Sequence, residues 1–209
     1  MPTLVHILRT PTLILCCLAS LLHGCAGIII GGAATGALIA HDRRTTGTII
    51  DDQALALEGE HRVNGDPRMA TGHINVSAYN GQVLLTGEVP QAAMRQQAET
   101  IVRSDPRVRR VFNELAIAAP SSFLARSSDV LLAGRVKANL FDVEIDGFDP
   151  TRVKIITERG IVYLMGLVTP EEGKAATEVV RRVGGVQKVV RLFEYVEIEQ
   201  PRPAAANAR

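Results

Sequence analysis

The sequence contains no tryptophan, few other aromatic residues, and no cysteine after position 25. Aromatic residues make up 4% of the 209 positions, which leaves little material for the stacking platforms that bind sugars or nucleobases. The three cysteines, at positions 16, 17 and 25, all lie in the first apolar stretch. Residues 26–209 therefore cannot form a disulfide, a cysteine-ligated zinc site or a cysteine nucleophile.

A large excess of charge of either sign is also missing. The chain has 23 Lys+Arg against 22 Asp+Glu, a net charge of +1. No group of basic residues is interleaved with aromatic ones, so we expect no nucleic-acid partner. Hydrophobic residues make up 46% of the chain, which is typical of globular proteins. With so few aromatic residues, the core must consist mainly of valine, isoleucine, leucine and alanine.

Residues that could form a catalytic or metal centre are sparse. In the body of the chain, His61 and His73 have no histidine or cysteine partner at ligand spacing, so we expect no metal site. The segment 142–153 resembles a calcium loop in its first positions, but it ends in Val153 where a bidentate glutamate is required. No base is placed to activate the serines between residues 121 and 128. We therefore predict that the protein is not an enzyme.

A long apolar stretch occupies the N-terminal part of the chain, from about Pro11 to His41. Its first part, PTLILCCLASLL, has the length of the hydrophobic region of a secretory signal. The sequence LHGC that follows, residues 22–25, resembles the lipobox of bacterial lipoproteins. This resemblance implies that residues 1–24 are a signal peptide and that Cys25 becomes an acylated N-terminus. Apart from this covalent lipid, we expect no cofactor.

The alternative is an uncleaved helix from about Leu13 to Ala40, which would exceed the roughly 20 residues needed to cross a bilayer. The stretch GIIIGGAATGALIA argues against it, because each of its glycines costs ~1 kcal/mol of helix propensity relative to alanine. The apolar stretch after Cys25 is also too short to span a bilayer before the charges of residues 42–44. We predict a small-residue tether over residues 25–45.

The rest of the chain contains two copies of one pattern, at residues 76–117 and 155–198. Each copy predicts two strands joined by a tight turn, then a helix that begins at a proline, then a last strand. The strands of the two hairpins are predicted at 73–78 and 82–89, and at 152–157 and 161–168; the helices begin at Pro90 and Pro170, and the last strands begin at Val108 and Val186.

An amphipathic segment precedes each copy, at residues 50–63 and 127–141. The order αββαβ predicts an α+β protein of two tandem domains, each a three-stranded mixed sheet with two helices. Because so small a sheet buries little surface, we expect the copies to pack on each other. Gly87 and Gly166, inside strands, predict a close approach of a helix or of backbone.

Polar residues near the starts of the two amphipathic helices predict how these helices are capped. Asp51 and Asp52 suit the first turn of the first helix. Ser127 or Ser128 is expected to be the N-cap of the second, with Asp129 in its first turn.

The two copies resemble BON domains, above all in GIVYLMGLVT at 160–169 and GVQKVVRLF at 185–193. The order of lipobox, tether, DRRTTGTIIDDQ at 42–53 and two repeats resembles that of the dual-BON outer-membrane lipoproteins of Gram-negative bacteria. The domains are then BON 1 at 46–118, a linker at 119–126, BON 2 at 127–199 and a disordered tail at 200–209.

The BON resemblance implies binding of phospholipids and a role in the integrity of the outer membrane and the envelope. It also implies that the protein is lipid-anchored in the outer membrane and faces the periplasm. Ala26, and not an aspartate, follows the cysteine of the lipobox, which is compatible with outer-membrane sorting.

The helix predicted from Ser127 to Phe141 has more apolar surface than its sheet can cover. Leu132, Val136 and Leu140 form its inward stripe. The residues predicted to face outward, together with those just ahead of the helix, form a candidate site for anionic phospholipid: Phe123, Leu124, Arg126, Val130, Leu131, Gly134, Arg135 and Ala138, with Lys137 as a further flanking cation.

Two alternatives to this lipid site remain open in the sequence. Val130 and Leu131 could pack on the first repeat. The same face could instead dock a protein, which would make the chain an adaptor for an envelope or outer-membrane assembly complex. The BON resemblance favours lipid over both.

Overall fold

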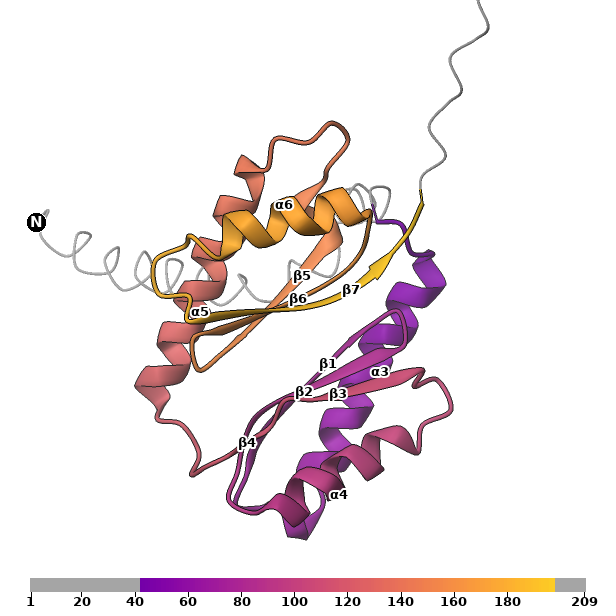
Figure 1. Cartoon of the computed structure of the whole chain (residues 1–209). Helices are drawn as coiled ribbons and strands as arrows, with labels where there is room; N and C mark the ends of the chain where they lie inside the picture. Colours follow the sequence, from indigo (N-terminus) through magenta and orange to yellow (C-terminus); the bar gives the residue numbers. More distant parts are fainter. Residues whose placement is uncertain (1–41, 198–209) are drawn as a thin grey trace, which may run out of the picture. The chain divides into compact units, whose positions relative to one another are not determined.

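The computed structural model describes residues 42–197. The predicted signal peptide, the lipidation site Cys25, nearly all of the tether and the tail lie outside these residues. From Asp42 onward the chain forms one compact unit, in which two repeats of helices and strands follow each other (Figure 1). Within residues 42–197, no helix combines the length and the apolar character that crossing a membrane requires.

The first repeat consists of two helices and a mixed sheet. Strand β2 lies in the middle, antiparallel to β1 and parallel to both β3 and β4. A break after Asn113 divides the last strand in two, so this sheet has four strands where three were predicted. The elements are α3 (Thr46–Asn64), the 3₁₀ turn η1 (Pro67–Met69), β1 (His73–Tyr79), β2 (Gln82–Val89), α4 (Ala92–Arg103), β3 (Arg110–Asn113) and β4 (Ala116–Ile117).

The second repeat has the same order and a three-stranded sheet. Strand β6 is central, antiparallel to β5 and parallel to β7. The α+β class and the αββαβ order of both copies are therefore confirmed. The elements are α5 (Phe123–Asn139), the 3₁₀ turns η2 (Leu140–Asp142) and η3 (Pro150–Arg152), β5 (Val153–Glu158), β6 (Ile161–Val168), α6 (Pro170–Val180) and β7 (Lys188–Tyr195).

Three of the four helices begin at other residues than the sequence predicted. Helix α5 begins at Phe123, where the Ser122 side chain accepts a hydrogen bond from the backbone of Ala125. Ser127 therefore lies inside the helix, and its hydroxyl donates to the Phe123 carbonyl. The prediction was wrong because it placed the N-cap next to the first buried residues, whereas the first turn of α5 is exposed. Likewise, α3 begins at Thr46, and α4 begins two residues after Pro90.

Helix α6 begins at Pro170, as predicted. Thr169 and Glu172 form a capping box, in which each side chain accepts a hydrogen bond from the other residue's backbone N–H.

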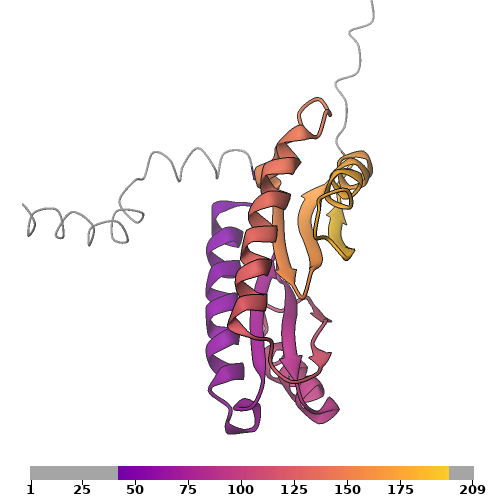
Figure 2. The ribbon, with the colours of Figure 1, turned by 90° about the vertical axis from the view of Figure 1, so that its left-hand side faces the viewer.

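Each sheet packs on both of its faces, one against the helices of its own repeat and the other against the second sheet. In β2, Val83, Leu85 and Val89 belong to the cluster that the helices of the first repeat cover. Leu84, on the opposite face, belongs to a separate cluster with residues of the second sheet. This shared cluster consists of Tyr79, Leu84, Tyr163, Met165 and Leu192. The two sheets thus face each other with helices on the outside (Figures 1 and 2), which confirms that the copies pack on each other.

The paired glycines inside the central strands permit close backbone contacts. Gly87 has a φ of +113°, and a side-chain Cβ there would collide with the carbonyl oxygen of His73 on β1. A Cβ on Gly166 would lie 2.9 Å from the carbonyl oxygen of Arg152. The predicted close approach at both glycines is confirmed, and in both cases the neighbour is backbone.

Candidate functional site

Helix α5 carries an exposed apolar surface along its outward side. Phe123, Leu124, Val130 and Leu131 are 81%, 75%, 71% and 69% exposed. At about 100° per residue, these side chains point away from the buried stripe of Leu132, Val136 and Leu140. We call the exposed side the α5 outer face and define it by Phe123, Leu124, Val130, Leu131, Gly134 and Ala138.

Helix α5 lies at the surface of the compact unit (Figure 2). Val130 and Leu131 are both exposed, so the alternative in which they pack on the first repeat is wrong. A Cβ added to Gly134 would meet no atom within 4 Å, which places this position too in open space. Of the large hydrophobic residues exposed within residues 42–197, these helix positions and the neighbouring Phe141 form the main concentration.

Two arginines border the α5 outer face. At about 100° per residue, Arg135 lies beside Leu131 on one edge and Arg126 beside Val130 on the other. Within the part of the chain that the structure describes, neither guanidinium group forms a hydrogen bond or an ion pair, so both can meet an external anion.

Lys137, predicted as a further flanking cation, is engaged elsewhere. Its Nζ donates hydrogen bonds to the carbonyl oxygens of Pro150, at 2.6 Å, and Val153, at 3.4 Å. Burial lowers the pKa of the Lys137 amine. The prediction that Lys137 flanks the lipid site is therefore wrong, because the long side chain folds back onto the segment before β5.

The last residues of the predicted tether bind to both repeats. Arg43 forms a bidentate ion pair with Glu172 of α6, at 2.6 and 2.8 Å, and donates to the carbonyl of Leu167 on β6. Burial alone would raise the pKa of Glu172, but the hydrogen bonds from Arg43 and from the Thr169 backbone, together with the charges of Arg43 and Arg152, lower it. Arg44 forms an ion pair with Asp52 of α3, at 2.7 Å.

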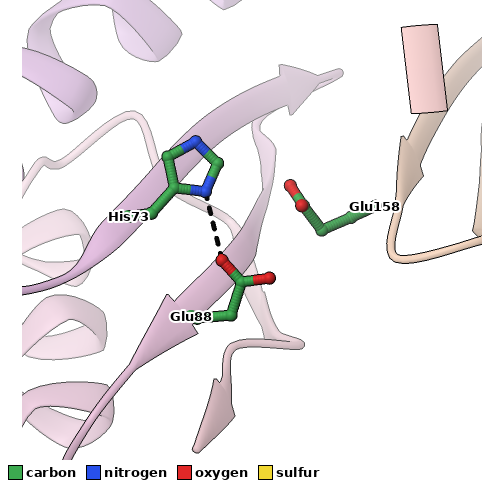
Figure 3. A group of neighbouring side chains, drawn as sticks. All are labelled: His73, Glu88 and Glu158. Carbon is green, nitrogen blue, oxygen red and sulfur yellow. Dashed lines mark hydrogen bonds and ion pairs between the residues drawn. The ribbon is translucent and has the colours of Figure 1, made fainter. Parts of the chain in front are cut away.

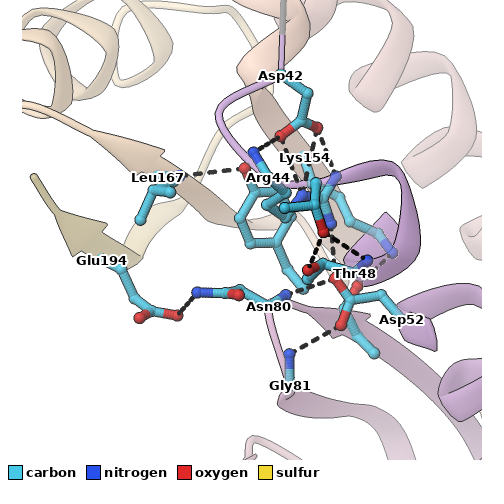
Figure 4. A network of polar contacts seen from close by, with 12 residues as sticks. Asp42, Arg44, Thr48, Asp52, Asn80, Gly81, Lys154, Leu167 and Glu194 are labelled. Atoms are coloured by element: carbon cyan, nitrogen blue, oxygen red, sulfur yellow. Dashed lines mark hydrogen bonds and ion pairs between the residues drawn. The ribbon is translucent and has the colours of Figure 1, made fainter. Parts of the chain in front are cut away.

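Arg44 and its neighbours form a connected polar network (Figure 4). The Arg44 guanidinium stacks on the Tyr79 ring, 3.6 Å from its centroid. The Tyr79 hydroxyl accepts from the backbone of Leu167 and donates to the Arg152 carbonyl, both in the second repeat. Lys154 of β5 donates to the Ala78 carbonyl in the first repeat. Residues 42–44 thus contribute directly to the contact between the two repeats.

A buried aspartate in each repeat holds the hairpin turn. Asp52 accepts hydrogen bonds from the backbone of Asn80 and Gly81, at 2.6 and 2.8 Å. Asp129 accepts equivalent bonds from Arg159 and Gly160, both at 2.8 Å. The two residues of each turn have positive φ, as type I′ hairpins require.

The prediction that Asp52 and Asp129 lie in the first turns of their helices is wrong, because α3 and α5 begin earlier. Both residues occupy later turns, where they face the sheet. Their equivalent places ahead of the two repeats were visible in the sequence and could have identified this shared role.

Sequence reasoning missed one further group of side chains. His73, Glu88 and Glu158 converge between the two sheets, with His73 Nδ1 3.3 Å from Glu88 Oε2 (Figure 3). Glu88 is fully buried and Glu158 is 6% exposed. Burial, followed by the charge of Glu88, raises the pKa of Glu158.

Comparison with known families assigns both repeats. The family model described as "BON domain" matches residues 51–119 and 128–197. The chain belongs to the BON-domain family. The two BON domains were predicted at residues 46–118 and 127–199. The second range contains its whole matched segment, and the first ends one residue before its matched segment ends.

Two relatives align with most of this chain. The "Outer membrane lipoprotein DolP" of Haemophilus influenzae is 39% identical over 178 residues, which cover 84% of this chain and 91% of the relative. The "21 kDa hemolysin" of Actinobacillus pleuropneumoniae is 33% identical over 158 residues, which cover 75% of this chain and 80% of the relative. Neither relative is named as an enzyme.

A solved structure is also similar to the BON chain. It is the C-terminal domain of CdsD, a structural protein of the type III secretion system of Chlamydia trachomatis. The alignment covers 68% of this chain and 98% of that structure, at 11% identity and a TM-score of 0.29.

Proposed function

We propose that the protein is an outer-membrane lipoprotein, acylated at Cys25, that faces the periplasm and supports the integrity of the envelope. Its second BON domain binds anionic phospholipid through the α5 outer face. The observation that carries the lipid proposal is the apolar stripe of α5, exposed opposite the helix's buried stripe and bordered by the unpaired Arg126 and Arg135. The proposal that the protein is a lipoprotein is supported by the lipobox and by the similarity to the outer membrane lipoprotein of Haemophilus influenzae.

The composition of the α5 outer face suits the interface of a membrane. Fully burying a leucine or phenylalanine side chain contributes ~1.5–3 kcal/mol, and each arginine near an anionic surface contributes ~1 kcal/mol. At half burial, the four exposed apolar side chains and two arginines together contribute on the order of 6 kcal/mol. That is weak for a free domain but useful for one that a lipid anchor already holds at a membrane.

Leu131→Glu is expected to abolish binding to anionic vesicles. The substitution places a carboxylate in the middle of the α5 outer face, where it opposes insertion and repels anionic headgroups. The fragment 42–209 contains the compact unit without the lipidation site, so it isolates the contribution of this face. The measurement is flotation of this fragment with vesicles that contain phosphatidylglycerol, and with phosphatidylcholine vesicles for comparison.

Leu57→Glu is the matched control for this experiment. Leu57 lies on α3 of the first BON domain and is 71% exposed, close to the 69% of Leu131. The Leu57→Glu variant should float with the vesicles as the wild type does. If both variants float like the wild type, or if both lose binding equally, the α5 outer face is not the lipid site. If Leu131→Glu floats normally but no longer captures an envelope protein, the adaptor function is correct instead.

Mass spectrometry of the mature N-terminus tests the lipoprotein proposal separately. When the full chain is expressed in a Gram-negative host, we expect residues 1–24 to be absent and Cys25 to carry a diacylglyceryl group. Cys25→Ser should remove the lipid and release the protein from the membrane fraction. Cys17→Ser is the control, because this cysteine lies in the segment that is removed, and it should change neither result. An intact N-terminus in the wild-type protein would refute the proposal.

A further inference from the structure

Three side chains that can ligate a metal converge where the two BON domains meet. His73 begins β1, Glu88 lies near the end of β2, and Glu158 ends β5. One nitrogen of His73 and one oxygen of each glutamate all lie within 4.8 Å of one another. The Glu158 carboxylate points toward the space beside the other two side chains (Figure 3). The cluster therefore joins two strands of the first domain to one strand of the second.

Polar atoms without partners gather at the same place. Within residues 42–197, the buried side-chain oxygens that form no hydrogen bond are Glu88 Oε1, Ser121 Oγ and Thr157 Oγ1. Ser121 contacts the cluster through its backbone N–H, which donates to Glu88 Oε2 at 3.1 Å. Thr157 lies on the other face of β5, with Ile155, and is not part of the cluster. Because buried oxygens in folded proteins are nearly always paired, the unpaired oxygens of Glu88 and Ser121 indicate a place for a ligand.

The charge of the cluster favours a cation. Two buried carboxylates this close repel each other unless a positive group lies between them. Arg159 approaches from the solvent side, with its guanidinium 3.9 Å from Glu88 Oε1, a distance that forms an ion pair but no hydrogen bond. Asn75 donates to Glu158 Oε2 at 2.9 Å, which orients that carboxylate without neutralising it.

We propose that His73, Glu88 and Glu158 bind a divalent transition-metal ion, with Zn²⁺ as its representative, and that this ion fastens the two BON domains together. One imidazole nitrogen and two carboxylate oxygens form a donor set that zinc accepts, with a fourth position left for water. Donors around tetrahedral zinc lie ~3.3 Å apart, so the present side chains need only small movements to close on the ion. The inference is independent of the proposed lipid binding.

The outer contacts of the site match those that support metal ligands elsewhere. The amide of Asn75 holds Glu158, and the backbone N–H of Ser121 holds Glu88. Such partners orient the ligating groups before the ion arrives, and their loss typically weakens metal binding 10–100-fold. Loss of a ligand itself should cost at least as much.

The test uses an untagged fragment of residues 42–209, which contains the compact unit, no cysteine, and two histidines. After treatment with a chelator and buffer exchange, the fragment is titrated with ZnCl₂ in a calorimeter. We expect one ion per chain. His73→Ala, Glu88→Gln and Glu158→Gln should each weaken binding by at least about tenfold. His61→Ala, at the exposed second histidine, should leave binding unchanged.

Thermal unfolding supplies a second readout, which a purely structural role of these residues would not move. ZnCl₂ should raise the unfolding midpoint of the wild-type fragment, and the rise should continue with the logarithm of the ZnCl₂ concentration above the dissociation constant, but Glu88→Gln should not show it. Without metal, Glu88→Gln should still fold cooperatively, because it keeps the side chain's shape and removes one of two repelling charges, although it also removes the ion pair with Arg159. Should this variant fail to fold, Glu158→Gln and His73→Ala decide.

Three results would overturn the metal site. The first is no binding of ZnCl₂ at millimolar concentration. The second is equal binding by the wild type and the three variants, which would indicate that carboxylates scattered over the surface bind the zinc. The third is equal affinity for MgCl₂ and ZnCl₂, because a site that uses an imidazole should prefer zinc.

Discussion

Gly87→Ala is expected to lower the free energy of unfolding by about 3 kcal/mol or more. At a φ of +113°, Gly87 occupies a region of backbone conformation that is essentially restricted to glycine. The added methyl group would also collide with the His73 carbonyl oxygen on the paired strand, and this atom belongs to the backbone. The strands would have to separate locally to admit it. Urea unfolding of the 42–209 fragment measures the effect.

Gly134→Ala provides the matched control, with the opposite sign expected. Gly134 lies within α5, and a Cβ there meets nothing within 4 Å. Alanine should therefore stabilise the helix by up to about 1 kcal/mol, the difference in helix propensity. The substitution of glycine by alanine is the same at both positions. It should destabilise the protein only at Gly87, where neighbouring atoms leave no room for a methyl group. A similar loss of stability in both variants would contradict this account of Gly87.

Asp129→Ala is expected to cost about 2–4 kcal/mol of stability, because it leaves one buried and one partly buried backbone N–H group without their acceptor. These groups belong to Arg159 and Gly160, and their bonds to the carboxylate are charge-assisted. Asp129→Asn should lose about half as much, since the amide oxygen can still accept one bond. The equivalent change in the first domain, Asp52→Ala, should cost a similar amount and also removes one of the two carboxylates that pair with Arg44, the other being Asp42.

Asp51→Ala is the control for the two buried aspartates. Asp51 is adjacent to Asp52 but exposed, so its replacement should change stability by no more than about 0.5 kcal/mol. The comparison is made by urea unfolding at one pH. If Asp51→Ala and Asp52→Ala have the same effect, the contribution of Asp52 is general helix electrostatics and not the hairpin turn.

Much of the fold could be predicted because its signals are local. The short, largely apolar runs of β2 and β6 and the turn residues between strands are each read within a few positions of backbone. The start of α6 was found for the same reason, since Thr169, Pro170 and Glu172 form a complete local signature. The start of α5 was missed because its first turn is exposed and has no apolar period to mark it.

The α5 outer face was also accessible from the sequence, because one helical period determines which side chains point away from the core. The exposure of Val130 and Leu131 agrees with that prediction. The environment of Lys137 was not accessible. Its acceptors, the carbonyls of Pro150 and Val153, approach the helix only after the chain has turned back.

The sequence by itself determined the two αββαβ repeats, the hairpin turns and the outward stripe of α5, since each depends on the geometry of a short length of backbone. Only the tertiary structure decided which faces of the sheets meet and where Arg43 and Arg44 bind. It alone brought His73 and Glu88 to Glu158, some 70 residues further along the chain. Contacts of this kind depend on how two separately formed surfaces pack, and no local periodicity encodes that packing.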